Sequence, residues 1–237
     1  MNSEGRVNSG HVAVGVVKAV GFDLDGTLFD HRGSATDGIR LFLRGIGVDP
    51  TASALDLWFA VEEAEFENWR AGRIDFREQR HRRLRVILTE FGIDFDDDPD
   101  SLDSLFEQYL TEYRRAWRPF PDVVETLTSL KVRGYRLGLL TNGNEDQQLG
   151  KLAATGLREI LDVVCISGAI GVQKPDARAF EALARSLGVA PHECLFIGDN
   201  PDQDVAGATA AGMRASLIER RRTGTPGLFA VTEAALA

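Results

Sequence analysis

The segment Asp23-Leu-Asp25-Gly-Thr27 directly follows the apolar run from Val12 to Phe22. An apolar run of this length that ends in turn-forming residues is typical of a buried β-strand. Side chains two residues apart in a strand point to the same side, so the two carboxylates are expected to lie together. Gly26 and Thr27 then turn the chain away. This segment is also typical of an ordinary strand followed by an Asp-Gly turn, so the rest of the sequence decides its meaning.

A second polar segment, Thr141-Asn142-Gly143, follows the apolar stretch 135–140. Asn-Gly usually favours a β-hairpin. Here the apolar residues that follow have helical spacing, and Asn144 is a suitable helix N-cap. The Thr141 hydroxyl and free backbone N–H groups are therefore expected at a strand-to-helix junction, which is a favourable place for a phosphate.

Two more polar segments follow further along the chain. Lys174-Pro175 precedes a predicted helix, and the proline disfavours a helix interior for Lys174, which is also consistent with a solvated loop lysine. Gly198-Asp-Asn-Pro-Asp-Gln-Asp204 follows the apolar stretch 194–197. The acidic loop is either a solvated turn or a ligand site. A calcium loop is excluded because Val205 stands where the sharp-turn glycine is needed and the closing Glu is absent.

In this order and at these strand ends, the four segments resemble the motifs of the haloacid dehalogenase (HAD) superfamily of hydrolases. The matching residues are Asp23-x-Asp25-x-Thr27, Thr141, Lys174 and Gly198-Asp199-x4-Asp204. The resemblance covers about residues 17–218. The stretch from Gly198 to Met213 is especially similar to family members that carry a helical cap inserted after the first motif.

The resemblance implies a covalent phosphatase mechanism. Asp23 is implied as the nucleophile that forms an aspartyl-phosphate and as a metal ligand. Asp25 is implied as the general acid and base, with its backbone carbonyl as a second ligand, and Asp199 as a third. The remaining roles are phosphoryl binding by Thr141, Asn142 and Lys174, with support from Thr27, Asn200 and Asp204.

Charge favours magnesium as the cofactor. A phosphate monoester is close to a dianion at neutral pH, and Asp23 is expected to be ionised as well. Their repulsion opposes the attack unless Lys174 and a divalent cation neutralise it. Mg²⁺ takes hard oxygen ligands and keeps several waters, so it is the expected ion.

The order of the elements predicts an α/β fold with a doubly wound parallel sheet. Strands are expected at about 17–23, 134–141, 162–167, 194–198 and 214–218, and helices at about 122–132, 145–156, 176–188 and 202–211. The ligand crevice of such a sheet lies at the carboxyl ends of its strands, where all four motifs fall.

Residues 31–117 contain four amphipathic segments and no convincing strand, which predicts an inserted α-helical bundle. The expected division is a flexible tail at 1–16, an α/β core at 17–30 and 118–237, and a helical cap at 31–117. The cap is expected to join the core through paired hinges near Asp30 and residues 119–121. Trp58 and Trp69 are expected in the bundle core.

The predicted cap has an asymmetric distribution of charge. Glutamates gather in its second segment, and an arginine-rich segment follows. Most of these arginines are expected to be solvated or paired with the acidic helix, and one or two to face the crevice and hold the anionic end of a substrate. The arginines are Arg70, Arg73, Arg77, Arg80, Arg82, Arg83 and Arg85.

Composition agrees with an enzyme of small molecules. The formal charge of −9 argues against nucleic-acid binding. No apolar stretch is long enough for a membrane span. Cys165 and Cys194 form no metal motif, and a reducing, cytoplasmic location is the simple interpretation. The chain is expected to be a monomer or a homodimer.

Within the family, Asp25 favours phosphoryl chemistry, because the dehalogenase branch lacks an Asp at this position. The sequence therefore predicts a Mg²⁺-dependent phosphatase of a small phosphorylated metabolite, with nucleotide monophosphates and sugar phosphates as leading substrates. Alternatives are a phosphomutase with the same residues, a phospho-Asp receiver domain and a binding protein without turnover. Receiver domains have no room for an inserted bundle, which disfavours that alternative.

Overall fold

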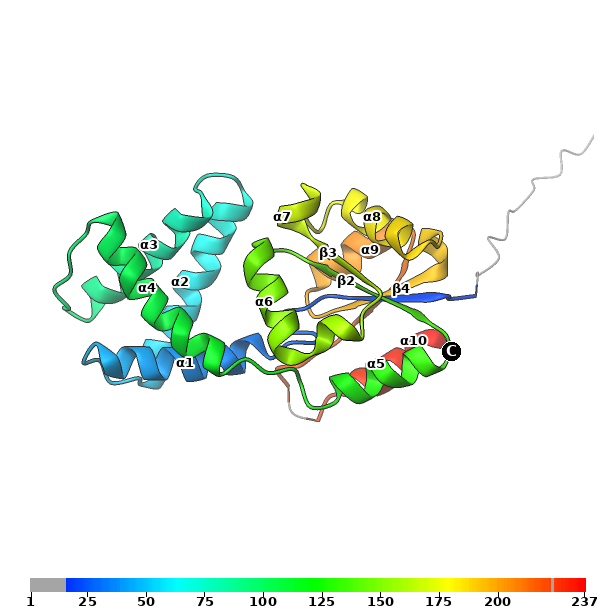
Figure 1. Ribbon diagram of the computed structural model, residues 1–237, viewed down its shortest axis with the longest axis horizontal. Coiled ribbons are helices and arrows are strands. Elements are labelled where there is room, and N and C mark those ends of the chain that lie inside the picture. Colours follow the sequence, from blue (N-terminus) through cyan, green and yellow to red (C-terminus); the bar gives the residue numbers. More distant parts are fainter. Residues whose placement is uncertain (1–15, 223) are drawn as a thin grey trace, which may run out of the picture.

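The chain is described here from a computed structural model that covers residues 16–222 and 224–237. Five strands form one sheet in the order β3-β2-β1-β4-β5, and every neighbouring pair is parallel (Figure 1). The predicted doubly wound sheet is therefore confirmed. Residues 1–15 of the predicted tail lie outside the described residues. The strands are β1 (Ala19–Phe22), β2 (Arg136–Thr141), β3 (Val163–Ile166), β4 (Cys194–Gly198) and β5 (Arg214–Leu217).

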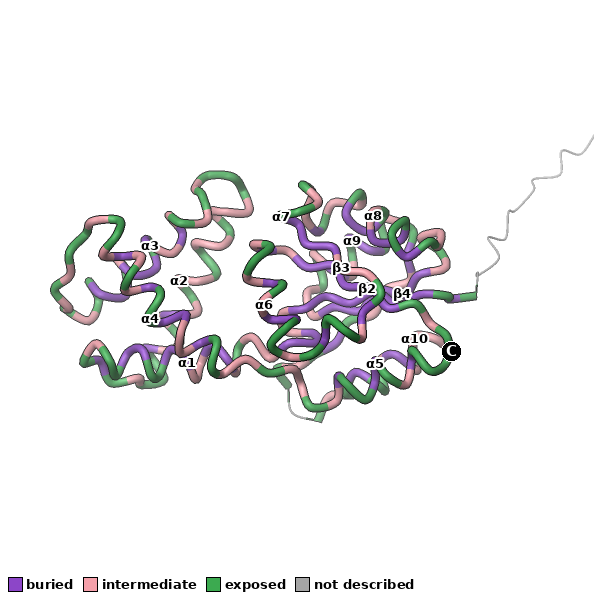
Figure 2. The backbone as a smooth tube through the Cα atoms, in the orientation of Figure 1, coloured by how far each residue is buried: buried purple, intermediate pink, exposed green. Residues whose placement is uncertain are grey.

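Helices cover both faces of the sheet. In Figure 1, α5 (Val123–Val132) and α10 (Leu228–Leu236) lie below the sheet, and α8 (Ala177–Leu187) and α9 (Gly207–Ala210) lie above it. Strands β1 and β4 are completely buried, β2 is buried except for Arg136, and the edge strands β3 and β5 are partly exposed (Figure 2). Helix α6 (Glu145–Thr155) begins at its predicted cap, because the Asn144 side chain accepts a hydrogen bond from the Gln147 N–H. Shorter elements are η1 (Leu157–Glu159), α7 (Ser167–Ile170) and η2 (Pro191–Glu193).

One predicted helix is different in the structure. The stretch 202–211 was expected to be continuous, but it divides into η3 (Pro201–Ala206), a π-helical turn, and the short α9. The Asn200 side chain accepts the N–H groups of Asp202 and Gln203 at 3.0 and 2.9 Å, which fixes the start of the turn. Helix α10 was not predicted.

Two glycines allow α8 to approach the sheet closely. Gly21 of β1 and Gly138 of β2 are directly paired across the strands. A Cβ atom on Gly21 or Gly138 would lie 2.7 Å from a methyl carbon of Leu183 in either case. The two glycines therefore form a flat patch against which Leu183 packs.

Four helices follow β1 in the sequence, before α5 and β2, and form the predicted bundle at one end of the molecule (Figure 1). Trp58 is buried in it, with its ring 4.7 Å from that of Tyr109. Trp69 is only partly buried, against Phe66 and Phe76. The helices are α1 (His31–Gly45), α2 (Ala52–Arg70), α3 (Phe76–Glu90) and α4 (Pro99–Arg115).

The two chain segments that join the bundle to the sheet pair with each other. The Asp30 N–H donates to the Arg118 carbonyl at 3.1 Å, and the Phe120 N–H donates to the Leu28 carbonyl at 3.0 Å. Arg118 also reaches the carboxylates of Asp30 and Asp37. The apolar core continues through this connection, because buried residues of the bundle and of the β1 face form one cluster.

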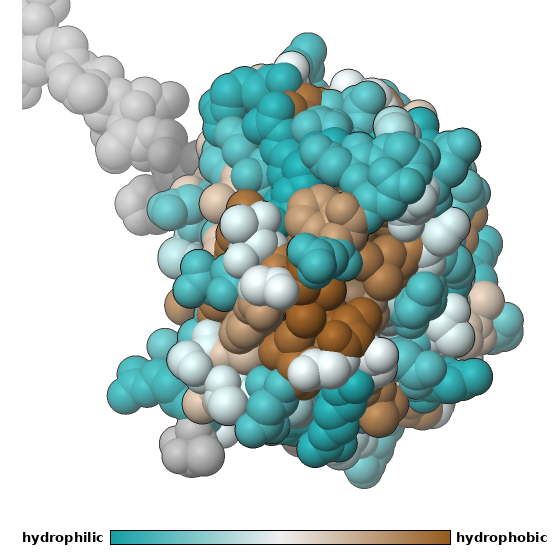
Figure 3. All heavy atoms as spheres, turned by 90° about the vertical axis from the view of Figure 1, so that its left-hand side faces the viewer, coloured by the Kyte–Doolittle hydropathy of each residue, from teal (hydrophilic) through white to brown (hydrophobic). Residues whose placement is uncertain are grey.

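The outer end of the bundle exposes part of its apolar interior. Figure 3 shows a patch of hydrophobic side chains in the middle of this face, surrounded by hydrophilic residues. Among the described residues, no helix combines the length and the apolar character that crossing a membrane requires.

The close packing of α8 can be tested with Gly21→Ala. The added methyl would meet Leu183 and Phe196 at under 3.0 Å, so we expect it to lower the free energy of unfolding by about 1–3 kcal/mol. Gly45→Ala is the matched control, because no atom lies within 4 Å of its Cβ position near the end of α1. Urea unfolding of both variants gives the comparison, and equal stabilities would contradict the packing argument.

Candidate active site

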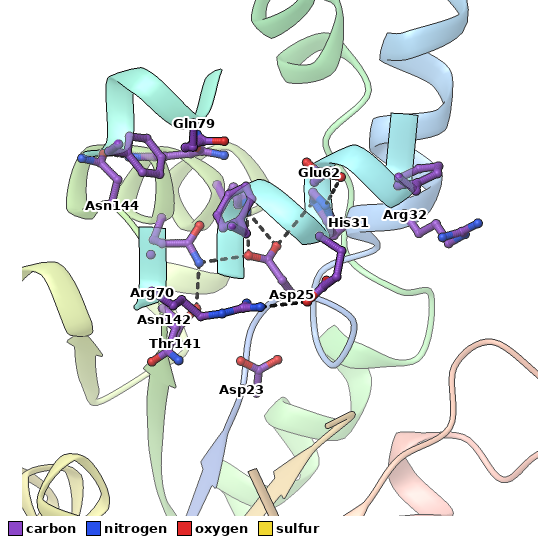
Figure 4. A pocket seen from close by; sticks show the side chains of 18 of the residues that line it. Asp23, Asp25, His31, Arg32, Glu62, Arg70, Gln79, Thr141, Asn142 and Asn144 are labelled. Atoms are coloured by element: carbon purple, nitrogen blue, oxygen red, sulfur yellow. Dashed lines mark hydrogen bonds and ion pairs between the residues drawn. The ribbon is translucent and has the colours of Figure 1, made fainter. Parts of the chain in front are cut away.

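The carboxyl ends of the strands and the inner side of the bundle enclose a cavity of about 370 Å³ (Figure 4). Most of the residues singled out in the sequence meet there, and Thr27 is the exception because it does not line the cavity. Three arginines of the arginine-rich segment also line it, namely Arg70, Arg80 and Arg83. The predicted site residues that line it are Asp23, Asp25, Thr141, Asn142, Lys174, Asp199, Asn200 and Asp204.

Lys174 lies at the centre of the core side of the cavity. Its Nζ donates to Asp23 Oδ1 and to Asp204 Oδ1, each at 2.6 Å, and all three side chains are buried. Burial opposes the charge on Lys174, but the two carboxylates outweigh this effect and raise its pKa. Lys174 is therefore a fixed positive charge between two strand ends.

The carboxylates around Lys174 outnumber it. Oxygen atoms of Asp23, Asp199 and Asp204 lie within 4.8 Å of one another. Burial, together with this mutual repulsion, raises the pKa of Asp23 to about 8 and that of Asp199 to about 6. The cluster therefore has the composition of a site for a hard divalent cation.

The free oxygens show which carboxylates could hold the metal. Both oxygens of Asp204 are engaged, one with Lys174 and the other with the Asn200 N–H at 3.0 Å. Asp23 Oδ2 is buried and has no hydrogen-bond partner. Asp23 and Asp199 therefore fit the role of side-chain ligands, and Asp204 fits a supporting role.

The turn after Asp23 brings the first and last motifs together. Gly26 has φ of +88°, and a Cβ atom there would lie 2.3 Å from Asp199 Oδ2, so only glycine fits. The Thr27 carbonyl accepts hydrogen bonds from Arg220 Nε and Nη2 at 3.1 and 2.9 Å. Thr27 is thus anchored away from the cavity.

Asp25 has its own cation, which the sequence analysis missed. Lys151 Nζ lies 2.7 and 2.8 Å from the two carboxylate oxygens, and Gln148 Nε2 donates to Oδ2 at 3.0 Å. Burial alone would raise the pKa of Asp25, but Lys151 and His31 hold it below its ordinary value. The two aspartates of the first motif therefore have opposite electrostatic environments.

The bundle supplies a second group of polar residues. Glu62 of α2 lies 2.8 Å from Arg83 Nη2 and 3.6 Å from His31 Nε2, and His31 Nδ1 lies 2.8 Å from the Tyr113 hydroxyl. Burial would raise the pKa of Glu62, but Arg83 and His31 lower it to about 2. The sequence analysis named neither Glu62 as a site residue nor His31.

The side chains of the second motif, Thr141 and Asn142, are bonded to other protein groups to a greater extent than expected. The side chain of Asn142 is fully used, because its Oδ1 accepts from the Lys174 N–H and its Nδ2 donates to the Lys174 carbonyl, each at 2.9 Å. Thr141 Oγ1 accepts from Gln148 Nε2 at 2.7 Å, and its own proton remains available. Only the backbone of Asn142 is left for a phosphate.

One sequence signal pointed weakly to the missed residues. Gln148 and Lys151 are three residues apart in α6, so they share one face of a helix that begins at the ligand edge of the sheet. Nothing in the sequence shows that the face of this helix that carries Lys151 is oriented toward the first motif.

The comparison with known proteins places this geometry in a family. The sequence model of the haloacid dehalogenase-like hydrolases matches residues 17–212. The chain belongs to this hydrolase family. The glyceraldehyde 3-phosphate phosphatase of Methanopyrus kandleri is 31% identical over 208 residues, which cover 86% of this chain and 85% of that protein.

Two further proteins show how far the similarity extends. The phosphoserine phosphatase of Thermus thermophilus is 38% identical over 169 residues, which cover 71% of this chain and 65% of that protein. The crystal structure of magnesium-bound YfnB, a HAD-hydrolase of Bacillus subtilis, superposes with a TM-score of 0.78. This match covers 93% of this chain and 99% of that chain at 18% identity, and it shows that the two proteins share a fold.

The pKa values of the carboxylate cluster predict how Mg²⁺ affects stability. Asp23 and Asp199 keep protons to higher pH in the folded protein than their ordinary value of 3.8 allows in the unfolded chain. The metal-free protein therefore loses stability as the pH rises toward about 8. Mg²⁺ competes with these protons, so we expect its stabilising effect to grow between pH about 6 and about 8.

Thermal unfolding with Mg²⁺ and with EDTA across this pH range measures the effect. Asp199→Asn should reduce the shift in Tm, while Asp202→Asn, an exposed neighbour that the cluster does not use, should keep it. A shift that is absent or independent of pH would contradict a metal site at these carboxylates.

Proposed function

We propose that this hydrolase is a Mg²⁺-dependent phosphatase that acts through an aspartyl-phosphate on Asp23. The observation that supports it most is that the two aspartates of the first motif contact different partners. Asp23 contacts Lys174 and the carboxylate cluster, whereas Asp25 contacts Lys151 and Gln148. One carboxylate is thereby arranged for attack beside a cation site and the other for proton transfer.

In the first step, an Asp23 carboxylate oxygen attacks phosphorus, and the bond to the ester oxygen breaks. Asp25 delivers its proton to the leaving alkoxide. Asp25 is ionised before the substrate binds, because Lys151 lowers its pKa. The approaching phosphate dianion increases its proton affinity, so that Asp25 takes up a proton from solvent as the substrate binds and carries it when the ester bond breaks.

In the second step, ionised Asp25 accepts a proton from water, and the water oxygen attacks phosphorus to release inorganic phosphate and free Asp23. Asp23 and Asp199, with the backbone carbonyl of Asp25, would hold Mg²⁺, which neutralises charge on the phosphoryl group when bound. The carbonyl is included because of the resemblance to the family, and the two side chains are included because Asp23 has a free buried oxygen and Asp199 lies in the same carboxylate cluster.

The phosphoryl oxygens have three partners in this proposal. Lys174 supplies a positive charge, and the Thr141 hydroxyl donates, because Gln148 leaves its proton free. The third partner is the backbone N–H of Asn142. Thr27, Asn200 and Asp204 stabilise the loops that carry these groups.

The bundle, residues 31–117, acts as the cap in this proposal. Its helices complete the cavity wall, which excludes water and contacts the part of the substrate beyond the phosphate. Two buried cysteines with free thiols, Cys165 and Cys194, agree with a reducing, cytoplasmic location.

Hydrolysis of nitrophenyl phosphate with Mg²⁺ and with EDTA tests the proposal. We expect Asp23→Asn to lose at least about 10³-fold in kcat while remaining folded, because the nucleophile is missing. Asp146→Asn, on the exposed first turn of α6, is the control. Activity that survives in folded Asp23→Asn, or in EDTA, would overturn the mechanism, and phosphate transfer to a second sugar hydroxyl would indicate a phosphomutase.

Lys151 is expected to matter most when the leaving group needs a proton. Lys151→Met removes the cation that orients Asp25, so we expect kcat to fall about 10- to 100-fold on an alkyl phosphate. The loss should be several times smaller on nitrophenyl phosphate, whose leaving group needs no proton. Lys131→Met is the control, since Lys131 is exposed on α5. Equal losses on both substrates would show that Lys151 does not act through Asp25.

A further inference from the structure

One stripe of helix α3 faces the cavity opposite the catalytic carboxylates. Four of its residues, spaced by three, four and seven positions as one helical face requires, line the cavity. They are Phe76, Gln79, Arg80 and Arg83. Figure 4 shows Gln79 and Glu62 at the end of the cavity away from Asp23. Together with Glu62, we call these four residues the α3 subsite.

Arg83 is held rigidly in the α3 subsite. Its side chain is only 4% exposed, and its guanidinium lies over the rings of Trp58 and Phe106 at 5.3 and 5.2 Å. Its Nε is buried and has no hydrogen-bond partner. A buried guanidinium with an unused donor, in a cavity wall, is arranged for a ligand that accepts hydrogen bonds.

Arg80 adds a charge that no carboxylate of the described residues pairs with directly, although Glu107 and Asp103 act on it at longer range. It makes no ion pair there, and its guanidinium lies over Phe76 at 4.7 Å and over Phe106 at 5.3 Å. Arg83 lies 5.2 Å from the same Phe106 ring, so the two arginines are close, and burial together with the positive charge of Arg83 lowers the pKa of Arg80. The neighbouring arginines of α3 differ, because Arg77, Arg82 and Arg85 all pair with carboxylates.

The α3 subsite therefore has an excess of one positive charge. Glu62 pairs with Arg83 at 2.8 Å, and no comparable partner is available for Arg80. Arg70 and Glu63, which also line the cavity, pair with each other at 2.8 Å and cancel. One further negative charge would complete the balance, and the ligand has to bring it.

Gln79 points to the same kind of ligand. It is 1% exposed, lines the cavity, and its Oε1 has no hydrogen-bond partner. A buried, unpartnered carbonyl oxygen costs free energy unless a ligand or water donates to it. A ligand that carries a hydroxyl or ammonium group beside an anion would satisfy both Gln79 and the arginines.

We infer that the α3 subsite binds the carboxylate of a small phosphorylated carboxylic acid, an inference that rests on the proposed phosphatase function. The phosphate binds at Lys174 and Thr141, and the carboxylate at Arg80 and Arg83. The cavity of about 370 Å³ is near the small end of ligand pockets, which span roughly 300–1,000 Å³. It suits a small metabolite.

This assignment disfavours nucleotides, which the sequence analysis placed among the leading substrates. A base would need an aromatic face to stack on, but a guanidinium already lies over Phe76 and over Phe106, two of the rings that line the cavity. The rings thus support the guanidinium groups. A neutral sugar phosphate would leave the charge of Arg80 unbalanced.

Phosphoglycolate and hydroxyethyl phosphate provide the test, because the second compound has a neutral CH₂OH group in place of the carboxylate. With Mg²⁺, we expect kcat/KM to be at least about tenfold higher for phosphoglycolate. Cytidine monophosphate serves as the nucleotide comparison and should be poorer than phosphoglycolate. Equal values for the first two compounds, or a preference for the nucleotide, would overturn the inference.

Variants of α3 show whether the arginines cause the preference. Arg80→Met should lower kcat/KM for phosphoglycolate about 10- to 100-fold and change that for hydroxyethyl phosphate less than about threefold. Arg83→Lys keeps the charge beside Glu62 but loses the planar fork, so the preference should also fall. Arg82→Met is the control, since Arg82 pairs with Glu78 outside the cavity. Equal losses on both substrates in Arg80→Met would contradict the inference.

Binding measurements separate this inference from the proposed function. Calorimetry on the full chain and on Asp23→Asn should give a Kd for phosphoglycolate at least about tenfold lower than that for hydroxyethyl phosphate. If nitrophenyl phosphate is not hydrolysed, the phosphatase proposal fails, and these Kd values still decide the α3 subsite. Equal Kd values in a protein that hydrolyses nitrophenyl phosphate would reject the subsite and leave the phosphatase function standing.

Discussion

The buried ammonium of Lys174 is the interaction on which the geometry of the site depends. It connects Asp23, at the end of β1, with Asp204, in the turn after β4, and Asn142 holds its backbone at the end of β2. Breaking a buried ion pair from one side costs about 3–5 kcal/mol, because the remaining charge loses its partner. One lysine cannot balance Asp23, Asp199 and Asp204 together, so the fold itself creates a demand for a further cation.

The same principle distinguishes the two aspartates of the first motif. Asp23 and Asp25 are two residues apart, yet they face different cations, Lys174 and Lys151. Crowded carboxylates and burial raise the pKa of Asp23 to about 8, while Lys151 lowers the pKa of Asp25. Helix α6 is responsible for the difference, because it brings both Lys151 and Gln148 to Asp25. Identical side chains can thus serve different chemistry when separate elements provide their surroundings.

The sequence predicted the sheet and the meeting of its motifs because both depend on local patterns. Apolar runs mark the strands, and polar residues at their ends must converge in a parallel sheet. Lys151 and Glu62 escaped as site residues because their positions depend on how helices tilt and pack, which periodicity does not encode. For the same reason the sequence could not show which of its listed arginines face the cavity, and Arg83 is one that does. The predicted helix 202–211 divides at Gly207, which packs against another segment of the chain. Gly207 approaches the Pro175 carbonyl so closely that a Cβ would lie 2.9 Å away, a tertiary contact with no local signal.

The two ends of the cavity have opposite electrostatic character, and this links the bundle to the chemistry. The core end has excess carboxylates, and the bundle end has excess arginines. In the proposed function, a cation at the core end makes it a receptor for phosphate, so the proposed substrate is an anion at both ends. The two ends are held together by one apolar core, because buried residues of the bundle and of one face of the sheet form a single apolar cluster. A change in the packing of α3 would therefore alter the distance between the two anion sites, and with it the length of the substrate that fits.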